Sequence, residues 1–255
     1  MNYKFILLVG LFVVQFLSLK SQTKFQMGIQ LIPGINFNHI KGTGNYPFST
    51  KNLMVCDHLI NLSYHLNEKF EIESGLGFYM TKAFLKVDVG KIGMHQNLNP
   101  SSGNDELFPM VPLICRYYFL DIKNNIKLFG IAGVNNLFTL GGTQSISSSK
   151  IDSTTVVFNN TFYELNSGYF PTLLAGVGFE YILKAQDRFG IKIFYQQGFK
   201  ELTYFDVYYS IESYDFDEQI RVVNKGSQLN LGIYYYFRPF GEKKGNRTPT
   251  NTITN

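Results

Sequence analysis

Apolar and polar residues alternate along the stretch from Gln228 to Phe237, which reads QLNLGIYYYF. Leu229, Leu231 and Ile233 share one parity, and the residues between them are polar or small. Because side chains of a β-strand point alternately to opposite faces, this stretch predicts a strand with one apolar face that ends in aromatic residues. Ten alternating residues match the length of a tilted strand that crosses a bilayer.

Seven further stretches alternate in a similar way and predict strands at residues 25–37, 54–66, 70–84, 108–119, 126–140, 169–183 and 189–204. The pattern is least clear in 126–140, where apolar residues occupy both parities. Pro33 has no N–H for a strand ladder, so we expect a β-bulge near it.

The connections between these strands fall into two classes. Short turns at 67–69, 121–125 and 184–188 alternate with longer segments at 41–53, 85–107, 141–168 and 205–225. Short periplasmic turns, long outer loops and an even strand number characterise outer-membrane barrels. The sequence therefore predicts an all-β fold, an eight-stranded antiparallel up-and-down transmembrane β-barrel in the cell outer membrane, with both termini periplasmic.

The polar parity of the predicted strands contains glycines and charged residues, and the apolar parity is almost free of charge. Exposed to water, the apolar parity would promote aggregation, whereas lipid requires such a surface. The polar parity therefore faces a narrow interior, where charges must pair because an uncompensated one costs several kcal/mol. The predicted interior charge network consists of Glu71, Glu73, Arg116, Glu180 and Lys192.

The composition supports this fold, and local sequence features divide the chain into a signal peptide, a barrel and a tail. The chain has 24 Phe, 17 Tyr and 23 Gly, but only 16% charged residues, which favours a barrel over a helical enzyme. Lys4 followed by the apolar run 5–19 predicts a signal peptide at 1–21, with an uncleaved anchor as the alternative. The barrel then occupies 22–239, and 240–255 is expected to be a disordered periplasmic tail.

Few residues suggest catalysis or ligand chemistry. Without Lys4 and Lys20, 21 basic residues remain against 19 acidic ones, so no nucleic-acid partner is expected. The four histidines and two cysteines lack metal-ligand spacing, so we expect no metal, cofactor or catalytic residue and predict that the protein is not an enzyme. His39 and His58 could meet near the outer rim, which leaves an esterase-like enzyme acting on lipid as a minor alternative.

The segment 205–225 is the candidate interaction surface. Its alternation around Tyr209 and Ile211 predicts a hairpin that continues above the membrane. Exposed aromatic residues anchor protein interfaces, and here they are interleaved with acids. The alternatives are a solvated loop repelled by lipopolysaccharide phosphates, or a calcium site at Asp215, Asp217 and Glu218, whose spacing lacks the full ligand pattern. The candidate residues are Tyr208, Tyr209, Tyr214, Asp215, Phe216 and Asp217.

Several strands resemble those of a known family. The run VPLICRYYF at 111–119 is similar to the "PLLLRYYF" strand of PorT-like outer-membrane β-barrel proteins, and 130–133, 175–181 and 231–237 look like later strands of that family. The final Phe237 resembles the C-terminal targeting signal of outer-membrane barrels. The resemblance implies a small eight-stranded barrel of a Gram-negative bacterium, and some relatives are implicated in the secretion of surface proteins. No catalytic residue carries over.

Together these patterns predict a non-enzymatic outer-membrane barrel that acts through its extracellular loops as a structural, assembly, secretion-associated or adhesion component. Its expected partners are outer-membrane lipid and lipopolysaccharide, with other envelope or secretion proteins as further candidates. The alternative is a barrel that binds a small ligand or handles a solute through a narrow interior.

Overall fold

The structure is a computed structural model that describes residues 25–41, 48–50, 52–81, 85–87, 106–122, 125–139, 142–146, 150–151, 156–183, 186–211 and 216–237. The predicted signal peptide (1–21) and periplasmic tail (240–255) lie outside these residues. Within them the chain forms strands and turns, and no helix there is long and apolar enough to span a membrane.

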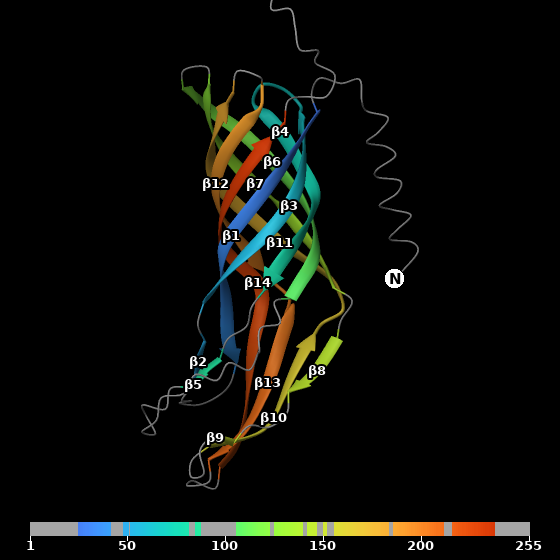
Figure 1. The fold of residues 1–255 in the computed structure, drawn as a ribbon, viewed down its shortest axis with the longest axis vertical. Coiled ribbons are helices and arrows are strands. Elements are labelled where there is room, and N and C mark those ends of the chain that lie inside the picture. Colours follow the sequence, from blue (N-terminus) through green and yellow to red (C-terminus); the bar gives the residue numbers. More distant parts are fainter. Residues whose placement is uncertain are drawn as a thin grey trace, which may run out of the picture.

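Eight strands of the described chain form a closed antiparallel barrel (Figure 1). Each pairs with the next along the chain, and the first pairs with the last to close the wall. The predicted fold class is therefore confirmed. The barrel strands are β1 (Phe25–Lys41), β3 (Leu53–His65), β4 (Phe70–Thr81), β6 (Glu106–Ile122), β7 (Ile126–Thr139), β11 (Gly168–Ile182), β12 (Arg188–Gly198) and β14 (Phe216–Tyr236).

The two faces of the wall have opposite character. Outward residues are large and apolar, such as Ile29, Leu113 and Val177, which are 55%, 57% and 60% exposed. Inward residues are buried, and many of them are polar. A closed ladder satisfies the backbone while this apolar band faces lipid, so the barrel has the surface of a membrane-spanning protein.

The interior is filled because small and large inward residues complement each other. A Cβ on Gly178 of β11 would lie 2.5 Å from Cζ of Phe129, on the neighbouring strand β7. Phe129, Ile131 and Leu137 are buried inside the barrel, which explains why β7 showed apolar residues on both parities. Glycines on one strand therefore make room for bulky residues on the next.

Pro33 does not cause the expected bulge. The β1–β3 register runs through the pair Pro33–Cys56 without a shift. Against β14, the register shift instead lies between Asn36 and Asn38. The pairs Leu31–Ile233 and Gly34–Asn230, on either side of Pro33, have the same register, so the wall continues past the proline without a bulge.

The predicted strand 189–204 is two strands. β12 ends at Gly198, and β13 (Thr203–Ile211) begins five residues later. Between them the Gly198 N–H donates to Ser227 Oγ over 3.1 Å, and the Leu202 N–H donates to the Asn224 carbonyl over 2.8 Å. The chain therefore stops pairing with β14 after Gln196 and pairs with it again from Thr203, in the sheet that extends beyond the barrel. Gly226 of β14, whose φ is 78°, lies between the two paired regions.

Two predicted long loops are largely β-structure. β14 continues beyond the barrel and pairs with β13, which confirms the predicted hairpin. The segment 141–168, predicted as a loop, supplies β8 (Gly142–Ile146), β9 (Lys150–Ile151) and β10 (Val156–Leu165), and β10 pairs with β13. Figure 1 shows this sheet extension, made of β14, β13, β10 and β8, projecting from the end opposite the short turns. A separate pair joins β2 (Phe48–Thr50) to β5 (Leu85–Val87).

Candidate functional site

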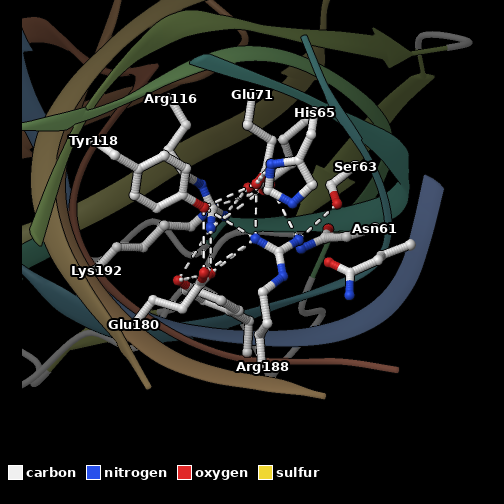
Figure 2. Close-up of polar contacts among 12 residues, drawn as sticks. Asn61, Ser63, His65, Glu71, Arg116, Tyr118, Glu180, Arg188 and Lys192 are labelled. Carbon is white, nitrogen blue, oxygen red and sulfur yellow. Dashed lines mark hydrogen bonds and ion pairs between the residues drawn. The ribbon is translucent and has the colours of Figure 1, made fainter. Parts of the chain in front are cut away.

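Arg116 on β6 is the centre of a buried charge network inside the barrel (Figure 2). Its Nη1 donates to Glu180 Oε2 over 2.9 Å, and its Nη2 forms a short contact with Glu73 Oε2. Nη1 also donates to the Tyr234 hydroxyl over 3.1 Å. The side chain is completely buried, so these groups replace the water that a guanidinium would otherwise require.

Arg188, at the start of β12, is a second arginine of the network. It donates to Glu71 Oε2 over 2.7 Å, to Glu180 Oε1 over 3.1 Å and to Ser63 Oγ over 2.8 Å. The sequence interpretation placed this residue in a turn and omitted it. A usable signal was present, because Arg188 shares the parity of Gly190 and Lys192 on the same strand.

Lys192 completes the charge balance. Its Nζ lies 2.7 Å from Glu73 Oε1. All five residues predicted for the network therefore lie in one cluster with Arg188, and every one is buried. The cluster holds three carboxylates and three cations and comes from four strands, β4, β6, β11 and β12.

Tyrosines donate further hydrogen bonds to carboxylate oxygens that already accept from the arginines. The Tyr118 hydroxyl donates to Glu71 Oε2 over 2.8 Å, and the Tyr234 hydroxyl donates to Glu180 Oε2 over 3.0 Å. The Arg116 guanidinium also lies 4.5 Å from the centre of the Phe129 ring. With its charges paired and hydrogen-bonded, the cluster is suited to joining the walls of the barrel, and it contains no nucleophile paired with a base.

Neutral polar groups occupy the interior near the sheet extension. Asn224 Nδ2 donates to Thr81 Oγ1 over 2.6 Å and to Asn38 Oδ1 over 3.1 Å. Asn36 Nδ2 reaches the same Thr81 hydroxyl over 2.9 Å. We call this part of the interior the long-loop half and the part around Arg116 the short-turn half. Apolar residues, including Leu137, accompany the amides.

The candidate interaction surface lies at the far end of the hairpin. Tyr208 and Tyr209 are in β13, where their backbones pair with Gln219 and Glu218 of β14, and Ser210 pairs with Asp217. Phe216 pairs with Ile211 at the end of the same ladder. Tyr214 and Asp215 lie outside the described residues. On its other side β13 pairs with β10, so the two tyrosines belong to an inner strand of the extension.

An ion pair joins the two strands at the base of the hairpin. Arg221 donates to both carboxylate oxygens of Asp206, over 2.7 and 2.8 Å, and its guanidinium lies 4.2 Å from the centre of the Tyr204 ring. The hydrogen bonds to Asp206 raise the pKa of Arg221 above its ordinary value. This paired, forked geometry gives the extension a defined register where it leaves the barrel.

The two histidines proposed for a lipid-cleaving site are not brought together. His58 of β3 pairs with Leu31 of β1, and His39 lies eight residues further along that strand, which corresponds to roughly 27 Å. The prediction that they meet is wrong. Among the described residues no cluster of His, Cys, Asp and Glu could hold a metal, and Cys56 and Cys115 are free thiols.

No family model and no curated protein matches the chain. Among solved structures it is similar to outer membrane protein OprG from Pseudomonas aeruginosa, with a TM-score of 0.48, 14% identity and coverage of 85% of this chain and 97% of that one. For a major outer membrane protein from Thermus thermophilus the values are 0.44, 13%, 84% and 99%. For Neisserial surface protein A they are 0.41, 11%, 84% and 97%. Membership of the PorT-like family stays a prediction.

Proposed function

We propose that this protein is a non-enzymatic outer-membrane barrel whose working surface is the sheet extension outside the membrane. It would serve there as an assembly, secretion-associated or adhesion component that binds another envelope or surface protein. The observation that carries the proposal is the contrast between a filled barrel interior and a wall that continues into a four-stranded sheet, β14, β13, β10 and β8.

The filled interior argues against transport through the barrel. Arg116, Glu73 and Lys192 are at most 1% exposed. Lys192 of β12 contacts Glu73 of β4 across the interior, and Glu73 also contacts Arg116 of the neighbouring strand β6. An eight-stranded barrel has an interior that side chains can just fill. A solute would have to break several charge-assisted hydrogen bonds to pass, so neither the structure nor the energetics favours a pore.

The extension has the architecture expected of a binding surface. Its strands are tied into the barrel through β14, which runs from Phe216 at the hairpin to Tyr236 in the wall. A partner would therefore meet a preformed sheet, and binding would cost less conformational entropy than ordering free loops. Tyr208 and Tyr209 are of the residue type that most often anchors protein interfaces.

The proposed orientation places the extension outside the cell. The apolar outer face supports a membrane location, and the segregation of short turns to one end and long segments to the other supports periplasmic termini. The similarity of residues 111–119 to a PorT-like strand supports a role in assembly or secretion.

The test replaces Tyr208, Tyr209, Tyr214 and Phe216 together with serine. A photoreactive amino acid at position 210 should cross-link the wild-type protein to a partner in intact cells, and the fourfold variant should lose that adduct. The matched control is Phe199→Ser, which changes an exposed aromatic residue at the barrel rim. Assembly is checked by the mobility difference between heated and unheated samples. Unchanged cross-linking by an assembled fourfold variant would contradict the proposal.

A further inference from the structure

Asp57 on β3 differs from every other buried acid among the described residues. Glu71, Glu73 and Glu180 lie in the balanced cluster, and Asp206 is paired with Arg221. Asp57 is 2% exposed and has no ion-pair partner in the described part of the chain. A buried carboxylate without a counter-charge is costly by several kcal/mol, so its neutralisation needs an explanation.

The Asp57 carboxyl group accepts one hydrogen bond from the backbone. Its Oδ1 accepts the Met80 backbone N–H over 2.7 Å. The last β3–β4 pair is His58–Phe78, so Met80 lies just beyond the ladder and the Asp57 side chain replaces the missing strand partner. This contact orients the carboxyl group but brings no positive charge to it.

Two further buried side chains beside Asp57 have oxygens without a well-aligned hydrogen bond among the described groups. Gln228 Nε2 donates to the Met80 carbonyl over 3.1 Å, while its Oε1 has no partner among the described groups. The hydroxyl of Tyr79, the residue before Met80, faces the Gln228 side chain but forms no well-aligned hydrogen bond with a described group. Both side chains are completely buried, and Gln228 extends from β14 across the interior to β4. The Asp57 carboxylate and the Gln228 amide thus flank the Met80 backbone, and the Tyr79 phenol faces the same amide.

We propose that Asp57, Tyr79 and Gln228 bind a monovalent metal cation, sodium or potassium, inside the long-loop half of the barrel. The three side chains offer hard oxygen donors, which alkali and alkaline-earth cations prefer. One positive charge neutralises Asp57 and supplies a partner for the Tyr79 and Gln228 oxygens at the same time. A divalent ion would leave one uncompensated positive charge in a buried site, and this disfavours it.

Bound there, the cation would complete the charge balance of the interior. In the short-turn half, arginine and lysine side chains supply all the positive charge, whereas the long-loop half would obtain its counter-charge from the medium. The ion would join β3, β4 and β14, of which β14 is separated from β3 by β1. Cation binding is therefore expected to stabilise the end of the barrel from which the sheet extension projects.

The experiment uses the full folded barrel in detergent. Sodium or potassium chloride replaces N-methylglucamine chloride at constant ionic strength, and the thermal unfolding midpoint is followed together with the ²³Na NMR line width. We expect saturable stabilisation by one or both ions and broadening of the sodium signal. Asp57→Asn should abolish both effects. Tyr79→Phe, which removes one oxygen, should raise the half-saturating concentration about tenfold. The control Glu201→Gln, which removes a half-buried acid paired with Lys41, should bind as wild type does.

The competing occupant is a proton on Asp57. A carboxylic-acid C=O infrared band that persists in saturating sodium and potassium and disappears in Asp57→Asn would overturn the proposal. Absence of saturable stabilisation by either ion would overturn it as well. If Asp57→Asn does not fold, the Tyr79→Phe titration decides the question, because an unchanged half-saturating concentration would contradict a site that uses this hydroxyl.

Discussion

The two halves of the barrel interior fill the same narrow space with different chemistry. Around Arg116, six charged side chains and several tyrosines form a dense network. The single carboxylate of Glu180, for example, accepts hydrogen bonds from Arg116, Arg188 and Tyr234. Around Asn224, single hydrogen bonds link amides and a threonine, and apolar residues fill the remaining space. Apart from Asp57, the charged side chains buried in the described interior of the barrel therefore lie where both signs are available.

This difference has an energetic consequence. In the short-turn half, the attraction between opposite charges offsets the cost of removing them from water. Removing one member therefore leaves its partners buried without compensation, which lowers stability. An amide in the long-loop half leaves behind only neutral groups, whose unmet hydrogen bonds cost less. We therefore expect the two halves to differ in their sensitivity to single substitutions more than in their contribution to stability.

The largest effect is expected from Arg116→Met. Methionine keeps an unbranched side chain but carries no charge, so Glu73 and Glu180 lose the cation that they share. The change should lower the free energy of unfolding by about 3–5 kcal/mol. Urea titration of the barrel in phospholipid vesicles measures this. Asn224→Ala, the counterpart in the long-loop half, should cost about 1–2 kcal/mol. Equal losses in the two variants would remove the proposed contrast.

The second prediction separates charge balance from the mere presence of charge. Glu73→Gln and Lys192→Met each leave a buried partner uncompensated, whereas the double variant is again neutral. In the same urea titration, the double variant should be about 2 kcal/mol more stable than the sum of the single losses predicts. Simple additivity would show that these two side chains act independently.

The smallest effect tests the packing that both halves share. Gly178→Ala should cost about 1–2 kcal/mol because its methyl group would lie 2.5 Å from the Phe129 ring. The matched control is Gly130→Ala in β7, where the nearest heavy atom to the new methyl lies 3.9 Å away. Thermal unfolding of the two variants in one detergent provides the comparison. A similar midpoint for both would mean that the interior adjusts around Phe129.

Local alternation predicted much of the wall and part of the candidate site. The parity of five residues was enough to place them all inside, since adjacent residues of a strand face opposite sides. These are Glu71, Glu73, Arg116, Glu180 and Lys192. Arg188 was missed because it follows a short turn, where the start of a strand cannot be located to within a residue. The break at Gly198 was missed because Phe199 keeps the outward apolar parity of β12. The end of the strand is marked instead by the tertiary contacts of Gly198 with Ser227 and of Leu202 with Asn224.

By itself, the sequence determined which residues face lipid, which face inward, and that eight such strands would close into a barrel. Only the tertiary structure decided which inward residues meet. Glu73 and Lys192 are 119 positions apart, and their contact follows from the stagger of strands around the closed wall. The same holds for the sheet extension, where β10 pairs with β13 across about 45 residues of sequence. Alternation is a local property of one strand, whereas register, stagger and closure belong to the whole sheet.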